Sequence, residues 1–544
     1  MSAQPIGTAA AAPAAQAWSN PHRLLPFLRL LLVLAAVVVA APASREDRST
    51  GPVVLASGWQ FRLDPGEVGL VQHWQDPSVG FPAQRSASTG VSLADQGIPE
   101  YRGYSWFRRT VTVPAGWRRI LLGFGGVDVA CQVYVNGVLA GEFRDSDLGD
   151  RAALIDLTGR VRPGQSFTLV LRVLGTGGFG GIKQTVRLGD DESEVMTSQQ
   201  YGLFLHQQHP DWLLLPWMAG QRRAWTVVGN ENANARAVAG ADGSFSPWSG
   251  SYSVSFWLYD VAAQRLVPFQ LPAASLAGSS PLPIFTFENG PWQLREELVP
   301  AGNAQHPAVE ARLTLLAAPG AAQLYVAVRP YATSGDMYPM RQVNFRGSSV
   351  WVNGALALSM SGVEGARGGA LASGDASSFA AAGTLPAASS VEDSRGAAQA
   401  LLRIPLTIGS ALTILAPSAP TTQAAPDAVD PQRQAATWQQ RTQHVQLDLP
   451  DQRLRRAFYA SLGYILTLTD DGQIRPGPLL HNAFWVRDAS VIGYALERAG
   501  LRDAVAGSSE ALLHAIDSGG SVTAITDAGG QPRPDVEWDA PGEA

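Results

Sequence analysis

The chain contains 544 residues with a formal net charge of −6, and 46% of its residues are hydrophobic and 16% charged. A chain of this length divides into several hydrophobic cores, and its acidic balance argues against a nucleic-acid partner. The single cysteine, Cys131, excludes an intramolecular disulfide. Because Cys131 lies in an alternating apolar run, we predict a buried and unreactive thiol.

The N-terminal region has the organisation of an export signal. Residues 1–22 are Ala-rich and are predicted to be disordered, and residues 23–43 combine Arg23 and Arg29 with an apolar run that ends in Ala-Pro-Ala. A basic start, a short apolar core and a small-residue end are typical of a signal peptide. The apolar stretch 24–41 nearly reaches the roughly 20 residues that span a bilayer, so an uncleaved membrane anchor is the alternative. Both interpretations predict a secreted or cell-envelope protein, outside the cytoplasm.

Residues 51–190 have the pattern of an antiparallel β-sandwich. Short alternating runs between Gly and Pro turns predict strands at 106–113, 120–124 and 167–173. Asn136-Gly137 predicts a type I′ hairpin, because both positions must adopt a positive φ. Tryptophan in a sandwich either packs in the core, which is the commoner case, or stacks on sugar. We expect the core for Trp59, Trp74 and Trp106.

The same region resembles a known carbohydrate-binding module. Its segment "SWFRRTVTVPAGWRRILLGFGGVDVACQVYVNGVLAGEF", followed by "IDLTGRVRPGQSFTLVLRV", is similar to the galactose-binding-like jelly roll that precedes the catalytic domain of family 2 glycoside hydrolases. The resemblance implies a sugar-binding accessory module without catalytic residues. In that family the catalytic residues lie in a TIM barrel, and no series of eight βα units is visible in this sequence.

A second β region is expected over 200–417. Strands are predicted at 252–259, 292–299, 309–316, 324–329, 350–360 and 412–415. The apolar, aromatic stretch 201–217 is interpreted as a strap packed between two domains. Residues 364–400 are rich in Ala, Gly and Ser and are predicted to be a mobile insertion, and 418–449 reads as a linker with a helix at 432–446. This region resembles the β-supersandwich that precedes the helical barrel of bacterial glucoamylase-like enzymes.

No metal or cofactor site is predicted. His206 and His209 lie close together in the sequence, but no cysteine or acidic residue adjoins them. A calcium-binding loop of the Asp-x-Asp-x-Asp type is also missing from the sequence. We therefore expect a carbohydrate as the partner of this chain, without a cofactor and without nucleic acid.

The C-terminal region 450–544 has the pattern of helices joined by polar loops. Helices are predicted at 451–469, with Asp451 at its start, at 488–499, with Asp488 as N-cap, and at 503–517. Trp485, Arg487 and Asp488 then lie at the mouth of the second helix. A Trp face, a forked guanidinium and a carboxylate suit a sugar ring and its hydroxyls. The alternative is a structural Trp beside a local ion pair.

The segment "DGQIRPGP" followed by "NAFWVRDASVIGYALERAG" resembles the first hairpin of the six-hairpin glycosidases, an (α/α)6-barrel superfamily. The resemblance implies that Trp485, Arg487 and Asp488 bind substrate. It also implies substrate binding by acids in the loop after the third helix, where Glu537 and Asp539 stand; an acidic loop that caps the next helix is the alternative.

The fold class that follows is multidomain: a β-sandwich jelly roll, a second large β-sandwich, and the first helices of an incomplete (α/α)6 barrel. A full barrel needs roughly 350 residues at about 15 residues per helix plus loops. In the resemblance the catalytic acid and base come from later loops, so the catalytic residues are unknown and a fragment of a longer enzyme is expected. We predict an exported glycoside hydrolase acting on O-glycosidic bonds of a poly- or oligosaccharide; the alternative is a non-catalytic carbohydrate-binding envelope protein.

Overall fold

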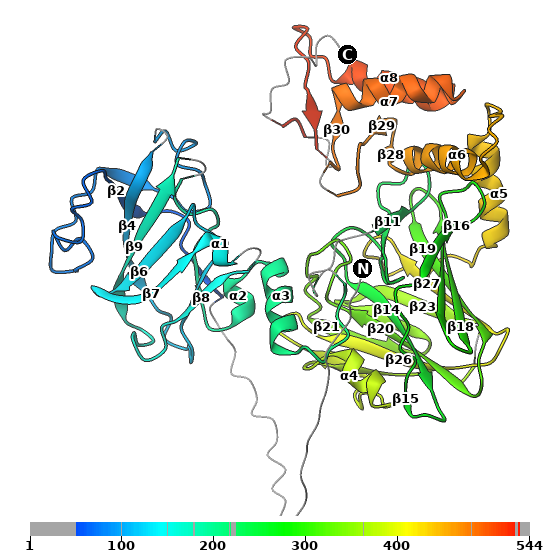
Figure 1. Cartoon of the computed structure of the whole chain (residues 1–544), viewed down its shortest axis with the longest axis horizontal. Helices are drawn as coiled ribbons and strands as arrows, with labels where there is room; N and C mark the ends of the chain where they lie inside the picture. Colours follow the sequence, from blue (N-terminus) through cyan, green and yellow to red (C-terminus); the bar gives the residue numbers. More distant parts are fainter. Residues whose placement is uncertain are drawn as a thin grey trace, which may run out of the picture. The chain divides into compact units, whose positions relative to one another are not determined.

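The computed structural model of the protein describes residues 51–98, 101–148, 151–177, 180–216, 218, 225–362, 364–479, 481–527 and 531–533. They form two β-sandwiches and a helical segment (Figure 1). The predicted disordered region 1–22, the predicted signal peptide or anchor 23–43, and the predicted site residues Glu537 and Asp539 lie outside the described residues. Of the helices in the described ranges, none has the length and apolar character needed to cross a membrane.

The first sandwich consists of two antiparallel sheets, a smaller one in the order β1-β10-β5-β8 and a larger one in the order β3-β2-β4-β9-β6-β7. Side chains from both sheets meet in one buried core. The strands are β1 (Val53–Val54), β2 (Trp59–Asp64), β3 (Arg85–Ala87), β4 (Arg102–Thr112), β5 (Leu121–Phe124), β6 (Ala130–Val135), β7 (Val138–Arg144), β8 (Ala153–Asp156), β9 (Ser166–Thr176) and β10 (Arg187–Gly189).

The sequence predictions for this sandwich are confirmed. Asn136 and Gly137 have φ values of 49° and 85° and join β6 to β7, as a type I′ turn requires. The three tryptophans are at most 2% exposed, so they are core residues and no sugar platform. Cys131 is also buried, and burial raises the pKa of its thiol far above the ordinary range.

One short helix, α1 (Asp145–Leu148), lies within the first sandwich. Two more, α2 (Glu192–Val195) and α3 (Ser198–Gln208), follow it. The Thr197 side chain accepts from the Gln200 N–H, and the Gln200 side chain accepts from the Thr197 N–H, which makes a capping box at the start of α3. The first half of the predicted strap 201–217 is therefore helical, because the sequence Thr-Ser-Gln-Gln supplies a helix start that the apolar content concealed.

The second sandwich is larger. One sheet has the order β11-β12-β13-β14-β20-β26-β24, with β15 beside β14, and the other has the order β16-β17-β18-β19-β27-β23-β22-β21-β25. An extended core of buried apolar side chains fills the space between them. The strands are β11 (Trp225–Val228), β12 (Ala237–Gly240), β13 (Phe245–Ser246), β14 (Ser253–Asp260), β15 (Arg265–Leu266), β16 (Ala273–Leu276), β17 (Pro283–Asn289), β18 (Trp292–Gly302), β19 (Pro307–Ala317), β20 (Ala322–Arg329), β21 (Gln342–Arg346), β22 (Ser349–Val352), β23 (Ala355–Ser361), β24 (Arg367–Leu371), β25 (Ser390–Glu392), β26 (Gln399–Leu406) and β27 (Ala411–Pro417).

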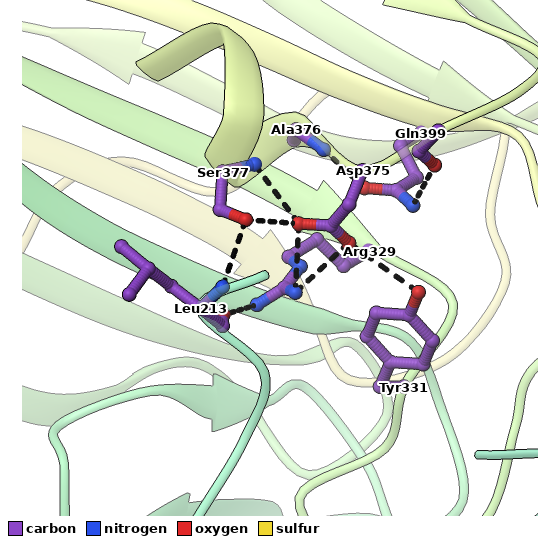
Figure 2. A network of polar contacts seen from close by, with 8 residues as sticks. Leu213, Arg329, Tyr331, Asp375, Ala376, Ser377 and Gln399 are labelled. Atoms are coloured by element: carbon purple, nitrogen blue, oxygen red, sulfur yellow. Dashed lines mark hydrogen bonds and ion pairs between the residues drawn. The ribbon is translucent and has the colours of Figure 1, made fainter. Parts of the chain in front are cut away.

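The segment 364–400, predicted to be a mobile insertion, is not an irregular loop. The segment contributes β24, β25 and the helix α4 (Ala376–Ala381), and β24 pairs with β26 in register. Its centre is held by Asp375, whose carboxylate lies 2.9 Å from the Arg329 guanidinium of β20 (Figure 2). Both side chains are at most 1% exposed. The Ala, Gly and Ser residues of this segment allow close packing, whereas their abundance in the sequence suggested mobility.

A carboxyl group without a partner lies in the core of the second sandwich. Glu296 of β18 is fully buried, and neither of its oxygens has a hydrogen-bond partner in the described residues. Its Oε2 lies against Gly243 in the β12–β13 turn, where an added Cβ would come within 2.5 Å of it. Burial, reinforced by the nearby Asp242 carboxylate, raises the pKa of Glu296 well above its ordinary value.

We expect Glu296→Gln to stabilise the protein at alkaline pH. The native state holds the Glu296 proton more tightly than the unfolded state, so this group's contribution to stability is complete below about pH 4.5 and is lost as the pH rises through the raised native pKa. Removing the ionisation should raise the free energy of unfolding by about 1–3 kcal/mol at pH 8 and by much less at pH 4. Thermal melts at both values measure this, with the exposed Glu288→Gln as control. An equal effect of Glu296→Gln at both pH values would contradict it.

The helical segment contains α5 (Pro431–Thr442), α6 (Gln452–Thr467), α7 (Val486–Arg498) and α8 (Arg502–His514), with short strands β28 (Thr469–Asp470), β29 (Gln473–Ile474), β30 (Phe484–Trp485) and β31 (Ile525–Thr526). The predicted helices are present, and Asp451 caps α6 by accepting from the Arg453 N–H. The prediction of Asp488 as an N-cap is wrong. Trp485 is the N-cap of α7 and Asp488 lies in its first turn, because β30 pairs with β31 and holds the chain extended up to Trp485.

Candidate functional site

The loop that leads to the predicted sugar site is anchored by a buried charge cluster. Asp470 forms ion pairs with Arg236, which precedes β12, and with Arg475, whose Nη1 lies 3.0 Å from Asp470 Oδ2. All three side chains are at most 8% exposed. Arg475 Nη1 also donates to Asn482 Oδ1 at 3.1 Å, which fixes the far side of the loop. The cluster therefore joins the second sandwich to the loop 470–482.

The predicted trio at the start of α7 divides into two parts. Trp485 is half-buried, and its indole N–H is buried without a hydrogen-bond partner in the described residues. Its ring meets the His481 ring edge to face, with centroids 5.9 Å apart. Arg487 and Asp488 form a loose ion pair at 3.8 Å, with side chains that are 42% and 35% exposed. The trio thus combines one packed aromatic ring with two solvent-accessible charged groups.

A cavity of about 440 Å³ includes His481, the residue that contacts the Trp485 ring, in its wall. Its walls come from β11, from the C-terminal end of α6 and from the loop before β30, and the lining residues are mainly apolar and aromatic: Trp225, Thr226, Val227, Tyr464, Leu468, Pro476, Gly477, Pro478, Leu479 and His481. In its wall the Thr226 and Tyr464 hydroxyls hydrogen-bond to each other at 2.8 Å. Burial raises the pKa of Tyr464, so this phenol is neutral and can donate or accept.

The structure connects Trp485 to this cavity and does not bring the two charged residues into its wall. His481 lines the cavity and contacts the ring of Trp485, which is not itself a lining residue. Arg487 and Asp488 are not lining residues, and the two remaining predicted site residues lie outside the described ranges.

Trp225 and Tyr464 line the cavity but were not predicted as site residues from the sequence. Trp225 is 40% exposed although it begins a strand of a large sandwich, which is unusual for an indole. Tyr464 falls in the helical pattern of α6 and gives no sign of facing a cavity.

Within the described ranges, no group of three or more His, Cys, Asp or Glu side chains is arranged to hold a metal ion. His209, one of the two histidines considered above, stacks on Trp212 with ring centroids 3.9 Å apart.

The cavity lined by Trp225, Thr226 and Tyr464 offers an aromatic and hydroxyl-bearing surface, which suits a neutral ligand with both C–H faces and hydroxyl groups.

The first sandwich matches the model of a known protein family. Residues 54–182 match the model of the family "Glycosyl hydrolases family 2, sugar binding domain". This agrees with the resemblance drawn from the sequence for that region: residues 54–182 are similar to the sugar-binding domain of family 2 glycoside hydrolases. The match does not extend to the second sandwich or to the helical segment.

Solved structures add only a distant likeness. Two structures of the β-glucuronidase of Ruminococcus gnavus, one of them without ligand, are each 16% identical to this chain, with TM-scores of 0.24 and 0.23. Each match covers 56% of this chain and 48% of the β-glucuronidase chain, so the chain spans about half of the length of these proteins. TM-scores this low give no basis for assigning a shared fold or activity.

Proposed function

We propose that the chain is the substrate-holding part of an exported glycoside hydrolase that acts on O-glycosidic bonds of a poly- or oligosaccharide. The observation that carries the proposal is the aromatic cavity beside Trp485, in a chain whose first domain is of the sugar-binding type. The helical segment is proposed to be of the six-hairpin type. This part of the proposal rests on the sequence resemblance at 471–500.

The chemistry of the cavity supports a saccharide ligand. The exposed Trp225 indole offers a flat apolar face against which the C–H side of a sugar ring can stack. The Thr226 and Tyr464 hydroxyls and the exposed His481 ring can exchange hydrogen bonds with sugar hydroxyls. Stacking excludes water from one face of the ring while the hydroxyl contacts set its orientation.

The proposal gives Trp485, Arg487 and Asp488 a supporting role in substrate binding, and it extends this role to Glu537 and Asp539. A glycosidase needs two carboxylates, one to protonate the leaving oxygen and one to activate water or to attack. By the register of the resemblance, neither is assigned to a residue of this sequence. Export is part of the same proposal, and N-terminal sequencing of the mature protein tests it: a start near residue 44 indicates cleavage, and an intact 24–41 segment indicates an anchor.

A second function is favoured by the family match itself. The matched domain type binds sugar, so a non-catalytic carbohydrate-binding envelope protein is the alternative. The two functions differ in one measurement. Release of reducing sugar by the full-length gene product from a polysaccharide that it binds supports the hydrolase, whereas binding without any release supports the alternative.

We expect Trp225→Ala to weaken oligosaccharide binding about tenfold or more, because the variant loses the stacking face. Isothermal titration of the chain against a panel of neutral gluco- and galacto-oligosaccharides measures the dissociation constant. The matched control is Val138→Ala, an apolar residue that is 63% exposed and lies in the first sandwich, far along the chain from the cavity residues. Unchanged binding by Trp225→Ala, with the control also unchanged, would remove the cavity from the proposal.

A further inference from the structure

A second pocket, of about 250 Å³, lies on the first sandwich. It occupies the face of the larger sheet opposite the core. Leu171 and Val173 of β9 belong to the core, so Arg172 between them projects from the other face. The residues that matter for its chemistry come from β4, β6, β7 and β9: Tyr104, Gln132, Glu142, Arg144, Arg172 and Leu174.

Arg172 is the central group of this pocket. Its side chain is only 7% exposed, and its guanidinium carbon lies 3.3 Å from the centroid of the Tyr104 ring. Nη1 donates to Gln132 Oε1 at 3.0 Å, and Nε is buried without a partner. Among the described residues, none supplies a carboxylate that forms an ion pair with Arg172. The guanidinium carries five N–H donors, of which the described residues pair one, to Gln132, and Arg172 lines the pocket.

A buried cation without a counter-ion is costly, and its usual partner is an anion in a fixed position. The other lining charges are Arg144 and Glu142, both exposed, so the pocket carries one net positive charge. Glu142 accepts from Gln132 Nε2 at 3.2 Å and is thereby held at the rim, next to the amide that contacts Arg172. Guanidinium groups bind planar carboxylates through parallel hydrogen bonds.

We propose that this pocket binds the carboxylate of an acidic sugar, with Arg172 as the primary contact and Arg144 as a second cation. The pocket is smaller than the roughly 300–1,000 Å³ of typical ligand sites, so it takes one sugar ring and not a chain. The saccharide part of this assignment rests on the proposed carbohydrate function, whereas the anionic part rests on Arg172 itself. The site is distinct from the aromatic cavity beside Trp485, because the two share no lining residue.

Titration of the full chain with sodium D-glucuronate, D-glucose and sodium acetate at low ionic strength tests the proposal. We expect glucuronate to bind, and to bind more tightly than either of the others. Arg172→Gln should weaken glucuronate binding about tenfold or more, and the exposed Arg144→Gln several-fold. Glu142→Gln keeps an oxygen that can accept the hydrogen bond from Gln132, but it removes a negative charge that repels the glucuronate carboxylate. It should therefore tighten glucuronate binding several-fold.

The sign of the Glu142→Gln effect keeps the test decisive if Arg172→Gln folds poorly. Weaker or unchanged glucuronate binding by Glu142→Gln would overturn the proposal, as would glucose binding as tightly as glucuronate. Acetate binding as tightly as glucuronate would overturn the sugar assignment. Trp225→Ala separates the two sites: it should reduce neutral oligosaccharide binding and leave glucuronate binding unchanged. Loss of glucuronate binding in Trp225→Ala would assign that ligand to the cavity beside Trp485 and overturn the proposal.

Discussion

Replacing Asp375 with asparagine is expected to lower the melting temperature of the second sandwich by roughly 10 °C. Removing one partner of a buried ion pair costs about 3–5 kcal/mol, because the remaining charge stays buried and unpaired. For a domain of this size each kcal/mol corresponds to about 2–4 °C. Asp375→Asn keeps the shape of the side chain, so the loss reports the charge and its hydrogen bonds and not a cavity.

The geometry around Asp375 explains the size of this effect (Figure 2). Arg329 Nη2 donates to both carboxylate oxygens, at 3.0 and 2.9 Å, while Oδ1 also accepts from the Ser377 N–H and hydroxyl and so caps α4. Arg329 Nη1 donates to the Leu213 carbonyl at 2.7 Å. One carboxylate thus ties β20, α4 and the segment after α3 together. An asparagine cannot accept all of these bonds.

Differential scanning calorimetry resolves the transition of the second sandwich from those of the other parts, which matters because a chain with several cores does not unfold in one step. The matched control is Asp336→Asn, an exposed aspartate of the same sandwich, which should shift no transition. A shift of less than about 2 °C by Asp375→Asn would show that the pair contributes no more than a surface salt bridge.

Replacing Asp470 with asparagine is expected to release the loop that carries the predicted sugar site. Two buried guanidinium groups, those of Arg236 and Arg475, then lose their shared counter-charge and repel each other. We expect a loss of about 3–5 kcal/mol in the stability of this junction, and with it a loss of oligosaccharide binding at the adjacent cavity.

Limited proteolysis with mass-spectrometric mapping measures that release, because cleavage within 470–482 should become much faster than in the wild type. Asp471→Asn is the matched control, since the neighbouring aspartate is exposed and lies in the β28–β29 turn. Equal cleavage rates in Asp470→Asn and Asp471→Asn would show that the charge cluster does not hold the loop.

Local patterns carried most of the fold that could be predicted. Alternation and the Asn136-Gly137 pair placed strands and a hairpin correctly, because these signals act between near neighbours. The strand predicted at 350–360 is instead the hairpin β22–β23, with its turn at Asn353 and Gly354. The errors arose where a partner is distant in sequence. Asp375 becomes ordered through Arg329, and α7 begins at Val486 because β30 pairs with a strand some 40 residues later.

The candidate site shows the same limit. Trp485 could be selected because it lies in a recognisable segment, but the cavity beside it is completed by Trp225 and Tyr464, which come from a sheet and from a helix that no local pattern relates. Arg172 was not singled out at all. An arginine in an alternating strand normally predicts an exposed side chain, and only the fold shows that Arg172 is covered and forms no ion pair with a carboxylate of the described residues.

The lone thiol of the chain gives the first sandwich a reporter of its own motion. Cys131 lies on β6 with 1% of its surface exposed, and its raised pKa leaves almost no thiolate at neutral pH. A thiol reagent can react with it only when the packing around β6 opens, so the labelling rate reports that opening. Since no other sulfhydryl competes, ligand-induced tightening of the domain can be followed in the intact protein without introducing a label elsewhere.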